Sequence, residues 1–185
     1  AHALGIERNI LLLDPTRYSV PETFVALIER RLAHEPVAYI VGYRDFWTVR
    51  IGVGPGVLIP RADSETLLEV TVAQCPPPHR ILDLGTGPGT LLLAALMEWQ
   101  DATGLGIDAS GMALDYARRN AAALGLAARA AFQVGNWGEG LDERFDLILC
   151  NPPYIGTDEP LMCDVAEHEP AEALFAGTDG LDDYR

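Results

Sequence analysis

The sequence predicts an α/β protein whose main part is a doubly wound parallel sheet with helices on both faces. Between residues 80 and 150, short apolar segments typical of buried strands alternate with helical segments, which is the pattern of parallel sheets. Of the 185 residues, 49% are apolar and 22% are charged, a balance that supports a packed core. No apolar run approaches the roughly 18–20 residues that a membrane-spanning helix needs.

The first forty residues are expected to be helical. Apolar residues recur at helical spacing from Phe24 to Leu32, and Ser19–Glu22 matches a capping box that would start this helix. A shorter helix around Ile10–Leu13 is expected to stop at Asp14-Pro15. A single amphipathic helix has too little to pack on, so we expect its apolar face to lie within a helical bundle or against another domain.

A β-hairpin is predicted between residues 43 and 60. Apolar residues alternate with polar or small residues from Trp47 to Val53, which is strand periodicity. Gly54-Pro55-Gly56 is expected to form the turn, and Val57–Ile59 to return as the second strand. This hairpin would join the helical part to the sheet.

The elements of the sheet are expected to follow the hairpin. Asp63 or Ser64 would cap a helix that the triple proline at Pro76–Pro78 ends. Ser110 would cap the helix that follows the second strand. The four predicted strands span residues 80–84, 104–108, 130–134 and 145–150.

A glycine-rich loop follows the first strand, and ligands of such sheets bind at the carboxyl ends of strands. The loop runs from Asp83 to Gly89 and reads Asp-Leu-Gly-Thr-Gly-Pro-Gly. Its glycines let the backbone turn tightly near a ligand, and the next helix offers unpaired N–H groups. The spacing G-x-G-x-G differs from the dinucleotide pattern G-x-G-x-x-G, so a plain tight turn stays an alternative.

Polar and aromatic residues end the second and third strands. A carboxylate at Asp108 could accept hydrogen bonds from the two hydroxyls of a ribose, while its alternative role is to cap the next helix. Asn136 could bond the edge of an adenine. Trp137 offers a flat surface beside that base, unless it is a core or lid aromatic.

The sharpest motif, Asn151-Pro152-Pro153-Tyr154, directly follows the fourth strand. Its two prolines fix the backbone and remove two N–H donors, so the loop presents carbonyl acceptors, and Asn151 adds an amide oxygen. Tyr154 adds an aromatic face. Such a loop suits a planar substrate that donates two N–H bonds, either a carboxamide or an exocyclic amine.

Together these motifs resemble methyltransferases that use S-adenosylmethionine and act on a planar nitrogen. Runs on either side of them are similar to the HemK/PrmC family of release-factor glutamine methyltransferases. Those runs are Glu35–Gly42, Phe46-Trp47, Val57–Arg61, Glu169–Leu174 and Asp179–Arg185. The resemblance covers about residues 2–185 and departs at Ala62, where the family usually has proline, and at Asn136, where Asp is common.

The resemblance implies a Rossmann-like methyltransferase sheet that is incomplete at its carboxyl end. Residues 1–42 would be part of an amino-terminal, substrate-recognition helical domain, residues 43–60 a β-hairpin linker, and residues 61–185 a truncated methyltransferase domain. The implied reaction moves a methyl group from S-adenosyl-L-methionine to the side-chain amide nitrogen of a glutamine and leaves S-adenosyl-L-homocysteine. That glutamine belongs to the Gly-Gly-Gln motif of class 1 peptide-chain release factors, which would be the protein partner.

The resemblance also implies roles for single residues. The glycine-rich loop would hold the methionyl part of the cofactor, Asp108 the ribose and Trp137 the adenine region. The cofactor-binding residues would be Asp83, Gly85, Thr86, Gly87, Pro88, Gly89, Asp108, Trp137 and Asn151. The substrate-binding residues would be Asn151, Pro152, Pro153 and Tyr154, of which Asn151, Pro152 and Tyr154 would be catalytic.

The composition limits the classes of binding partner and of chemistry that we expect for this protein. All 13 basic residues are arginines, so lysine-dependent chemistry is excluded for this stretch of chain, and 27 acidic residues give a net charge of −14. That charge argues against broad nucleic-acid binding, which needs basic residues to replace counterions. The three cysteines and four histidines are scattered, which is typical of an intracellular protein with neither disulfides nor a metal site. We therefore expect a cytoplasmic monomer without metal or membrane partner.

Two other functions remain open at this point. An N6-adenine methyltransferase for DNA or RNA would use the same Asn-Pro-Pro-Tyr loop, although it would need a basic groove. A non-catalytic module that binds a nucleoside cofactor would not need that loop. The family's sheet has strands beyond the fourth, so we also expect the 185 residues to be the middle of a longer, two-domain enzyme.

Overall fold

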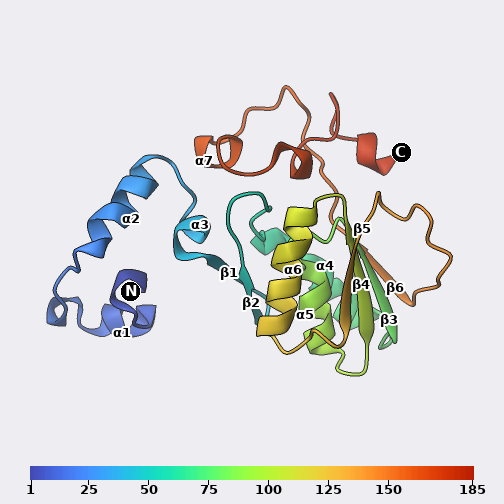
Figure 1. Ribbon diagram of the computed structural model, residues 1–185, viewed down its shortest axis with the longest axis horizontal. Coiled ribbons are helices and arrows are strands. Elements are labelled where there is room, and N and C mark those ends of the chain that lie inside the picture. The colour runs from blue at the N-terminus through green and yellow to red at the C-terminus, as the bar shows by residue number, and fades with distance from the viewer.

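A computed structural model describes residues 1–185 and places four parallel strands at the centre of the main body (Figure 1). The strand order is β5-β4-β3-β6, with every neighbouring pair parallel. Chain order and sheet order diverge beside β3, because the chain moves outward from β3 to β4 and β5 and then crosses back to form β6. The strands are β3 (Arg80–Leu84), β4 (Thr103–Asp108), β5 (Ala130–Val134) and β6 (Leu147–Cys150). All four predicted strands, and the α/β class, are confirmed.

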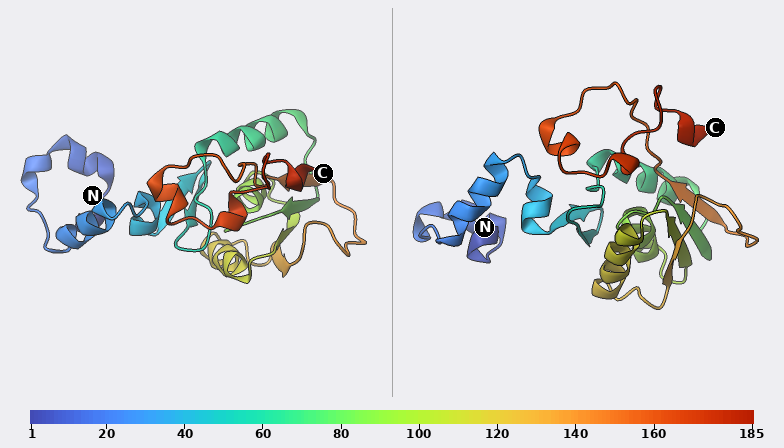
Figure 2. Two further views of the ribbon diagram at one scale, coloured as in Figure 1. Left: turned by 90° about the horizontal axis from the view of Figure 1, so that it is seen from above. Right: turned by 45° about the horizontal axis from the view of Figure 1, so that its top comes forward.

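Three helices cover one face of this sheet (Figures 1 and 2). They are α4 (Glu65–Gln74), α5 (Thr90–Glu98) and α6 (Gly111–Ala123). Two successive right-handed crossovers in the same direction place α5 and α6 on the same side, and the return to β6 contains no helix. The expected cover on both faces is therefore not formed by these residues, and Ile148 of β6 remains 59% exposed.

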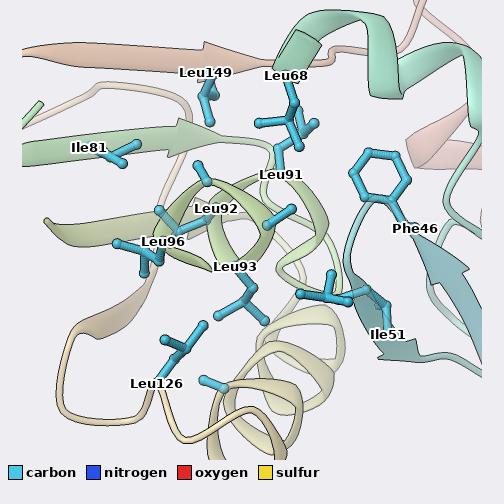
Figure 3. Packing of buried hydrophobic residues seen from close by; sticks show 14 of the residues in the cluster. Phe46, Ile51, Leu68, Ile81, Leu91, Leu92, Leu93, Leu96, Leu126 and Leu149 are labelled. Carbon is cyan, nitrogen blue, oxygen red and sulfur yellow. The ribbon is translucent and has the colours of Figure 1, made fainter. Parts of the chain in front are cut away.

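The helix α5 is the centre of the core. Its residues Leu91–Leu96 are all at most 5% exposed, and Figure 3 shows its leucines between the sheet, α4 and α6. Phe46 and Ile51 reach the same cluster from the hairpin. Burial of each such side chain contributes about 1.5–3 kcal/mol. Because the glycine-rich loop leads directly into α5, the core fixes one end of that loop.

The predicted hairpin forms, but its turn lies at residues 47–48 and not at Gly54-Pro55-Gly56. Strands β1 (Tyr43–Phe46) and β2 (Val49–Gly52) are antiparallel, and Trp47 sits in the turn with a φ of 52°. Tertiary hydrogen bonds fix this register. The backbone N–H of Trp47 donates to the Glu65 carboxylate at 3.0 Å, and the indole N–H donates to Glu98 at 2.6 Å.

The predicted strand Val57–Ile59 is wrong. Val57 and Ile59 are buried, but this segment has no strand partner, and the Ile59 N–H donates to the carboxylate of Glu169 at 2.9 Å instead. The Ile59 N–H thus bonds to a side chain 110 residues further along the chain and not to the backbone of a neighbouring strand.

The amino-terminal part consists of short helices set to one side of the main body (Figure 1). They are α1 (Arg8–Leu13), α2 (Thr23–Leu32) and α3 (Val37–Val41). No residue of α1 or α2 is buried, and the apolar face of α2 stays exposed, with Phe24 at 40% and Leu32 at 76%. That face therefore lacks the partner that the sequence led us to expect. The carboxyl-terminal part contains one further short helix, α7 (Cys163–Ala166).

Several predicted helix caps are wrong, whereas one is confirmed. Helix α2 begins at Thr23 without a side-chain cap, so the capping box at Ser19–Glu22 does not form. Neither Asp63 nor Ser64 caps α4, which continues from a short 3₁₀ turn that already supplies its first backbone bonds. Ser110 does cap α6, since its hydroxyl oxygen accepts from the N–H of Ala113 at 3.2 Å.

None of the helices combines the length and the apolarity that crossing a bilayer requires. Nowhere do three His, Cys, Asp or Glu side chains gather closely enough to hold a metal ion.

Candidate functional site

A cavity of about 300 Å³ opens at the carboxyl ends of all four parallel strands, β3, β4, β5 and β6. The loops that follow these strands line it together with the segment after the hairpin and the start of α6. The lining residues that the sequence singled out are Asp83, Gly85, Thr86, Gly87, Pro88, Asp108, Asn136, Trp137, Asn151 and Pro153. Residues up to 70 positions apart in sequence, from Asp83 to Pro153, thus meet at one edge of the sheet.

The glycine-rich loop depends on left-handed backbone. Gly85, Gly87 and Gly89 have φ values of 66°, 56° and 85°, which only glycine adopts without strain. The N–H of Gly87 donates to the Asp108 carboxylate at 2.7 Å. Gly89 does not line the cavity, and a Cβ there would lie 2.9 Å from the side chain of Leu93. Gly89 therefore allows close packing on Leu93, and the cofactor contact expected for it stays a prediction.

Asp83 is a buried carboxylate with one oxygen free. Its Oδ2 accepts from the Thr86 hydroxyl at 2.6 Å and from the N–H of Leu92 at 3.2 Å, whereas Oδ1 has no hydrogen-bond partner. Burial, with a smaller contribution from the negative charge of Asp108, raises the pKa of Asp83 to about 7, although the hydrogen bonds from Thr86 and Leu92 act in the opposite direction. An unpaired oxygen in such a place is costly unless a ligand donates to it.

Asp108 joins the glycine-rich loop to the start of α6. While its Oδ2 accepts from Gly87, its Oδ1 accepts from the N–H of Ser110 at 2.8 Å. Asp108 is therefore not the cap of α6, because the hydroxyl of Ser110 has that role. Each carboxylate oxygen accepts more than one hydrogen bond, so both keep an acceptor site for a ligand in the cavity.

Trp137 and Asn136 form another wall of the cavity. The Trp137 ring lies over Gly85, where an added Cβ would meet it at 3.4 Å. Trp137 has a φ of 49°, an uncommon conformation for a bulky residue that is often found at ligand sites. The amide nitrogen of Asn136 donates to Glu139 at 2.8 Å, which leaves its oxygen as an acceptor.

Asn151 lies where the first cavity meets a second one. The second cavity measures about 260 Å³, is mostly apolar, and shares Leu58, Arg61, Asn151 and Ala173 with the first. Pro152 and Tyr154 line only the second cavity. The Asn-Pro-Pro-Tyr motif is thus divided between two spaces, with Asn151 facing both.

The segment of residues 171–180 holds the Asn-Pro-Pro-Tyr loop from outside. The N–H of Ile155 donates to the Leu174 carbonyl, and the N–H of Ala176 donates to the Ile155 carbonyl, both at 3.0 Å. A Cβ on Gly180 would lie 2.4 Å from the carbonyl oxygen of Tyr154, so this close approach requires glycine. Tyr154 itself is 59% exposed.

Sequence reasoning gave no role to Glu169, which fastens the segment after the hairpin. Its side chain is 1% exposed and accepts from the N–H of Ile59 and from the Arg61 guanidinium at 2.7 Å. The Tyr39 hydroxyl donates to the Val57 carbonyl in the same segment, and burial raises the pKa of Tyr39. Arg61 is thereby held beside both cavities. The only sequence signal for this role was the run Glu169-Pro170.

The first cavity is strongly acidic. Besides Asp83 and Asp108, the carboxylates of Glu172 and Asp183 line it, and neither was predicted as a site residue. Arg61 is the one basic residue in the lining, and its charge is paired with Glu169. The arrangement favours a ligand that carries positive charge and offers hydroxyl groups and a flat ring system.

Two family models match parts of this chain. The family model of a methyltransferase domain matches residues 78–175, and that of a PrmC N-terminal domain matches residues 1–42. The chain is similar to the release factor glutamine methyltransferases of Rhodospirillum rubrum, at 46% identity over 100% of this chain and 58% of the relative, and of Xylella fastidiosa, at 44% over 100% and 69%. It thus spans about three-fifths to two-thirds of the length of these relatives.

Among solved structures, the chain is similar to a SAM-dependent methyltransferase from Geobacter sulfurreducens in complex with S-adenosyl-L-homocysteine. The identity is 29%, the TM-score is 0.41, and the match covers 49% of this chain and 36% of that one.

Proposed function

The chain belongs to the release factor glutamine methyltransferase family, and from this premise we propose its reaction. It transfers a methyl group from S-adenosyl-L-methionine to the side-chain amide nitrogen of the glutamine in the Gly-Gly-Gln motif of class 1 peptide-chain release factors. The observation that carries the proposal is the position of Asn151, which lines both the acidic cavity and the apolar one. A polar side chain in this position can contact the cofactor in one cavity and the substrate in the other.

The acidic cavity fits S-adenosylmethionine. The free Oδ1 of Asp83 suits the cofactor's ammonium group, and the open acceptor sites of Asp108 suit its ribose hydroxyls. Trp137 suits the adenine region, and the carboxylates of the lining suit the overall positive charge. When bound, S-adenosylmethionine supplies an electrophilic methyl group on its sulfonium. The chain's own residues bind it, orient it and surround it with negative charge.

The proline loop fits a carboxamide. An amide nitrogen is a weak nucleophile because its lone pair is delocalised into the carbonyl group. The side-chain oxygen of Asn151 and the carbonyl oxygen of Pro152 accept hydrogen bonds from the two N–H groups of the substrate amide. These bonds fix the amide nitrogen at the junction of the cavities. Positioning of this kind can supply roughly 7–11 kcal/mol to catalysis, and the same acceptors stabilise positive charge that develops on the nitrogen. As the nitrogen–methyl bond forms, the methyl–sulfur bond breaks and S-adenosyl-L-homocysteine leaves, and the methylated amide then loses one proton to water.

Tyr154 and the amino-terminal helices serve the protein substrate. Tyr154 lines the second cavity and is largely exposed, so its ring can stack on the amide plane. Residues 1–42 form the substrate-recognition part, 43–60 the linker and 61–185 the methyltransferase part. The exposed apolar face of α2 supports this division, because an uncovered apolar face marks a contact surface. Because peptide-chain release factors act on cytoplasmic ribosomes, we place this reaction in the cytoplasm.

Methyl transfer from labelled S-adenosylmethionine tests the proposal. We expect label in a purified class 1 release factor and none in its variant with the Gly-Gly-Gln glutamine replaced by alanine. Duplex and single-stranded DNA and RNA are tested in parallel. Label in nucleic acid alone would identify an N6-adenine methyltransferase, and cofactor binding without transfer to any acceptor would identify a non-catalytic binding module.

A further inference from the structure

Three glycines at alternate positions let the hairpin and the loop after it lie directly on α6. An added Cβ would come within 2.8, 2.3 and 2.2 Å of the facing side chains. The facing pairs are Gly52 with Asn120, Gly54 with Tyr116, and Gly56 with Met112. Two residues of extended chain span about 6.4–6.8 Å and four helical residues about 6.0 Å, so glycines two apart meet side chains four apart.

Asn120 differs from the other two facing side chains, Tyr116 and Met112, because it hydrogen-bonds to the backbone that it faces. It is 5% exposed. Its Oδ1 accepts from the N–H of Gly52 at 2.8 Å, and its Nδ2 donates to the Gly52 carbonyl at 3.1 Å and to the Pro88 carbonyl at 2.8 Å. One buried amide therefore ties the end of the hairpin to the glycine-rich loop, which are 36 positions apart in sequence.

Both segments that Asn120 joins lead into the site. Pro88 lines the acidic cavity, between Gly87, whose N–H is bonded to Asp108, and Gly89, which packs on α5. On the other side, the chain continues from Gly52 to Leu58 and Arg61, which line both cavities. Asn120 itself lines neither cavity, so it can affect ligands only through these two segments.

We propose that Asn120 is a positioning residue for the cofactor. By holding the Pro88 carbonyl, it fixes the glycine-rich loop in the shape that accepts S-adenosylmethionine, with the hairpin as its anchor. The inference rests on the proposed function, since it concerns the same cavity. A purely structural role would lower stability and leave the affinity of the folded protein for cofactor unchanged.

Binding of S-adenosylmethionine, measured by calorimetry beside the melting temperature, tests the proposal. Asn120→Ala removes all three hydrogen bonds and should raise the Kd about tenfold, the scale of one lost buried hydrogen bond. Gly52→Ala should also raise the Kd, because its Cβ would displace the Asn120 amide. In the methyl-transfer assay, both variants should raise the KM for cofactor more than they lower kcat.

Gly54→Ala is the matched control. Its Cβ would push the outer end of the half-buried Tyr116 ring, which has no bond to the glycine-rich loop, so the Kd should stay within twofold although the melting temperature falls. Wild-type Kd in Gly52→Ala and Asn120→Ala would overturn the proposal, and Gly52→Ala alone decides if Asn120→Ala does not fold. Absence of cofactor binding in the unaltered protein would instead overturn the proposed function, and this inference with it.

Discussion

The glycine-rich loop and the proline loop stand side by side yet are built in opposite ways. They follow the neighbouring strands β3 and β6, whose last residues, Leu84 and Cys150, are paired in the sheet. The first loop uses glycine to reach left-handed backbone. Hydrogen bonds between its backbone and the side chains of Asp108 on β4 and Asn120 on α6 hold it in place. The second uses proline rings for rigidity and is held from outside by residues 171–180.

The two loops also serve different ligands. The glycine-rich loop borders an acidic cavity suited to a cationic cofactor, whereas the proline loop offers acceptors to an amide and borders an apolar cavity. Substitutions in the first region should therefore change cofactor affinity, and substitutions in the second should change methyl transfer. Each variant below tests whether the two effects separate.

Asn151→Ala should have the largest effect. Loss of one acceptor for the substrate amide should lower kcat about 10²–10³-fold, the cost of removing one such preorganised group. The Kd for S-adenosylmethionine should change by less than about threefold, because Asp83, Asp108 and Trp137 remain in place. Single-turnover methyl transfer and calorimetry measure the two quantities. Near-normal turnover in the variant would show that Asn151 does not position the amide.

Asp83→Asn should act on the cofactor side. If the free Oδ1 of Asp83 accepts from the cofactor's ammonium group, its replacement by a neutral amide should raise the Kd about 10–100-fold. Since the pKa of Asp83 is raised to about 7, affinity in the unaltered protein should also fall as pH drops below 7. That pH dependence should be absent in Asp83→Asn; an equal slope in both proteins would assign it to another group.

Asp83 should also make stability depend on pH. Its pKa in the folded state lies above the value of 3.8 expected for an exposed Asp, so the folded protein holds this proton more tightly than the unfolded chain does. The stabilisation is fully present below about pH 4 and is lost as pH rises to about 7. Denaturant titrations without cofactor should show the free energy of unfolding falling over this range relative to Asp83→Asn. A parallel course of the two curves would contradict the assignment.

Glu169→Gln should have a moderate effect on both stability and substrate binding, because Glu169 holds Arg61 beside both cavities. It weakens the bonds to Ile59 and Arg61, so the free energy of unfolding should fall by about 1–3 kcal/mol. The KM for release factor should rise several-fold, because Arg61 borders the apolar cavity. The exposed Glu167, which has no side-chain bond, provides the control, and Glu167→Gln should match the unaltered protein in stability. Equal stability in both variants would refute the role of Glu169.

Tyr154 substitutions should have the smallest effects. Tyr154→Phe keeps the aromatic face and should retain methyl transfer within about twofold. Tyr154→Ala should lower kcat/KM about 2–5-fold, as expected for an exposed aromatic contact. Steady-state assays with release factor measure both, and a larger loss in Tyr154→Phe would mean that the hydroxyl, and not the ring, is the working group.

Local sequence signals predicted the four parallel strands and both loops well, because each signal lies within a few residues of the feature that it marks. The glycines at residues 85–89 and the prolines after β6 are such signals. The hairpin register was wrong because distant groups decided it, whereas the missing cap of α4 has a local cause, the 3₁₀ turn that precedes this helix. Trp47, for example, forms its turn where Glu65 and Glu98 accept its N–H groups.

The same reason explains which site residues were missed. Glu169 and Asn120 act on backbone groups 110 and 68 positions away. Neither residue type predicts such a partner, since a buried carboxylate or amide bonds whichever backbone the fold brings near. Gly52 carried a weak signal, because a glycine at the end of a strand often marks a close approach.

The most direct test of the central claim is to locate the methyl group in the product. A class 1 release factor is incubated with the protein and S-adenosylmethionine, digested and sequenced by tandem mass spectrometry. The account predicts one added methyl, on the side-chain amide nitrogen of the Gly-Gly-Gln glutamine. A methyl on any other residue, or an unmodified glutamine after incubation with cofactor-binding protein, would contradict it.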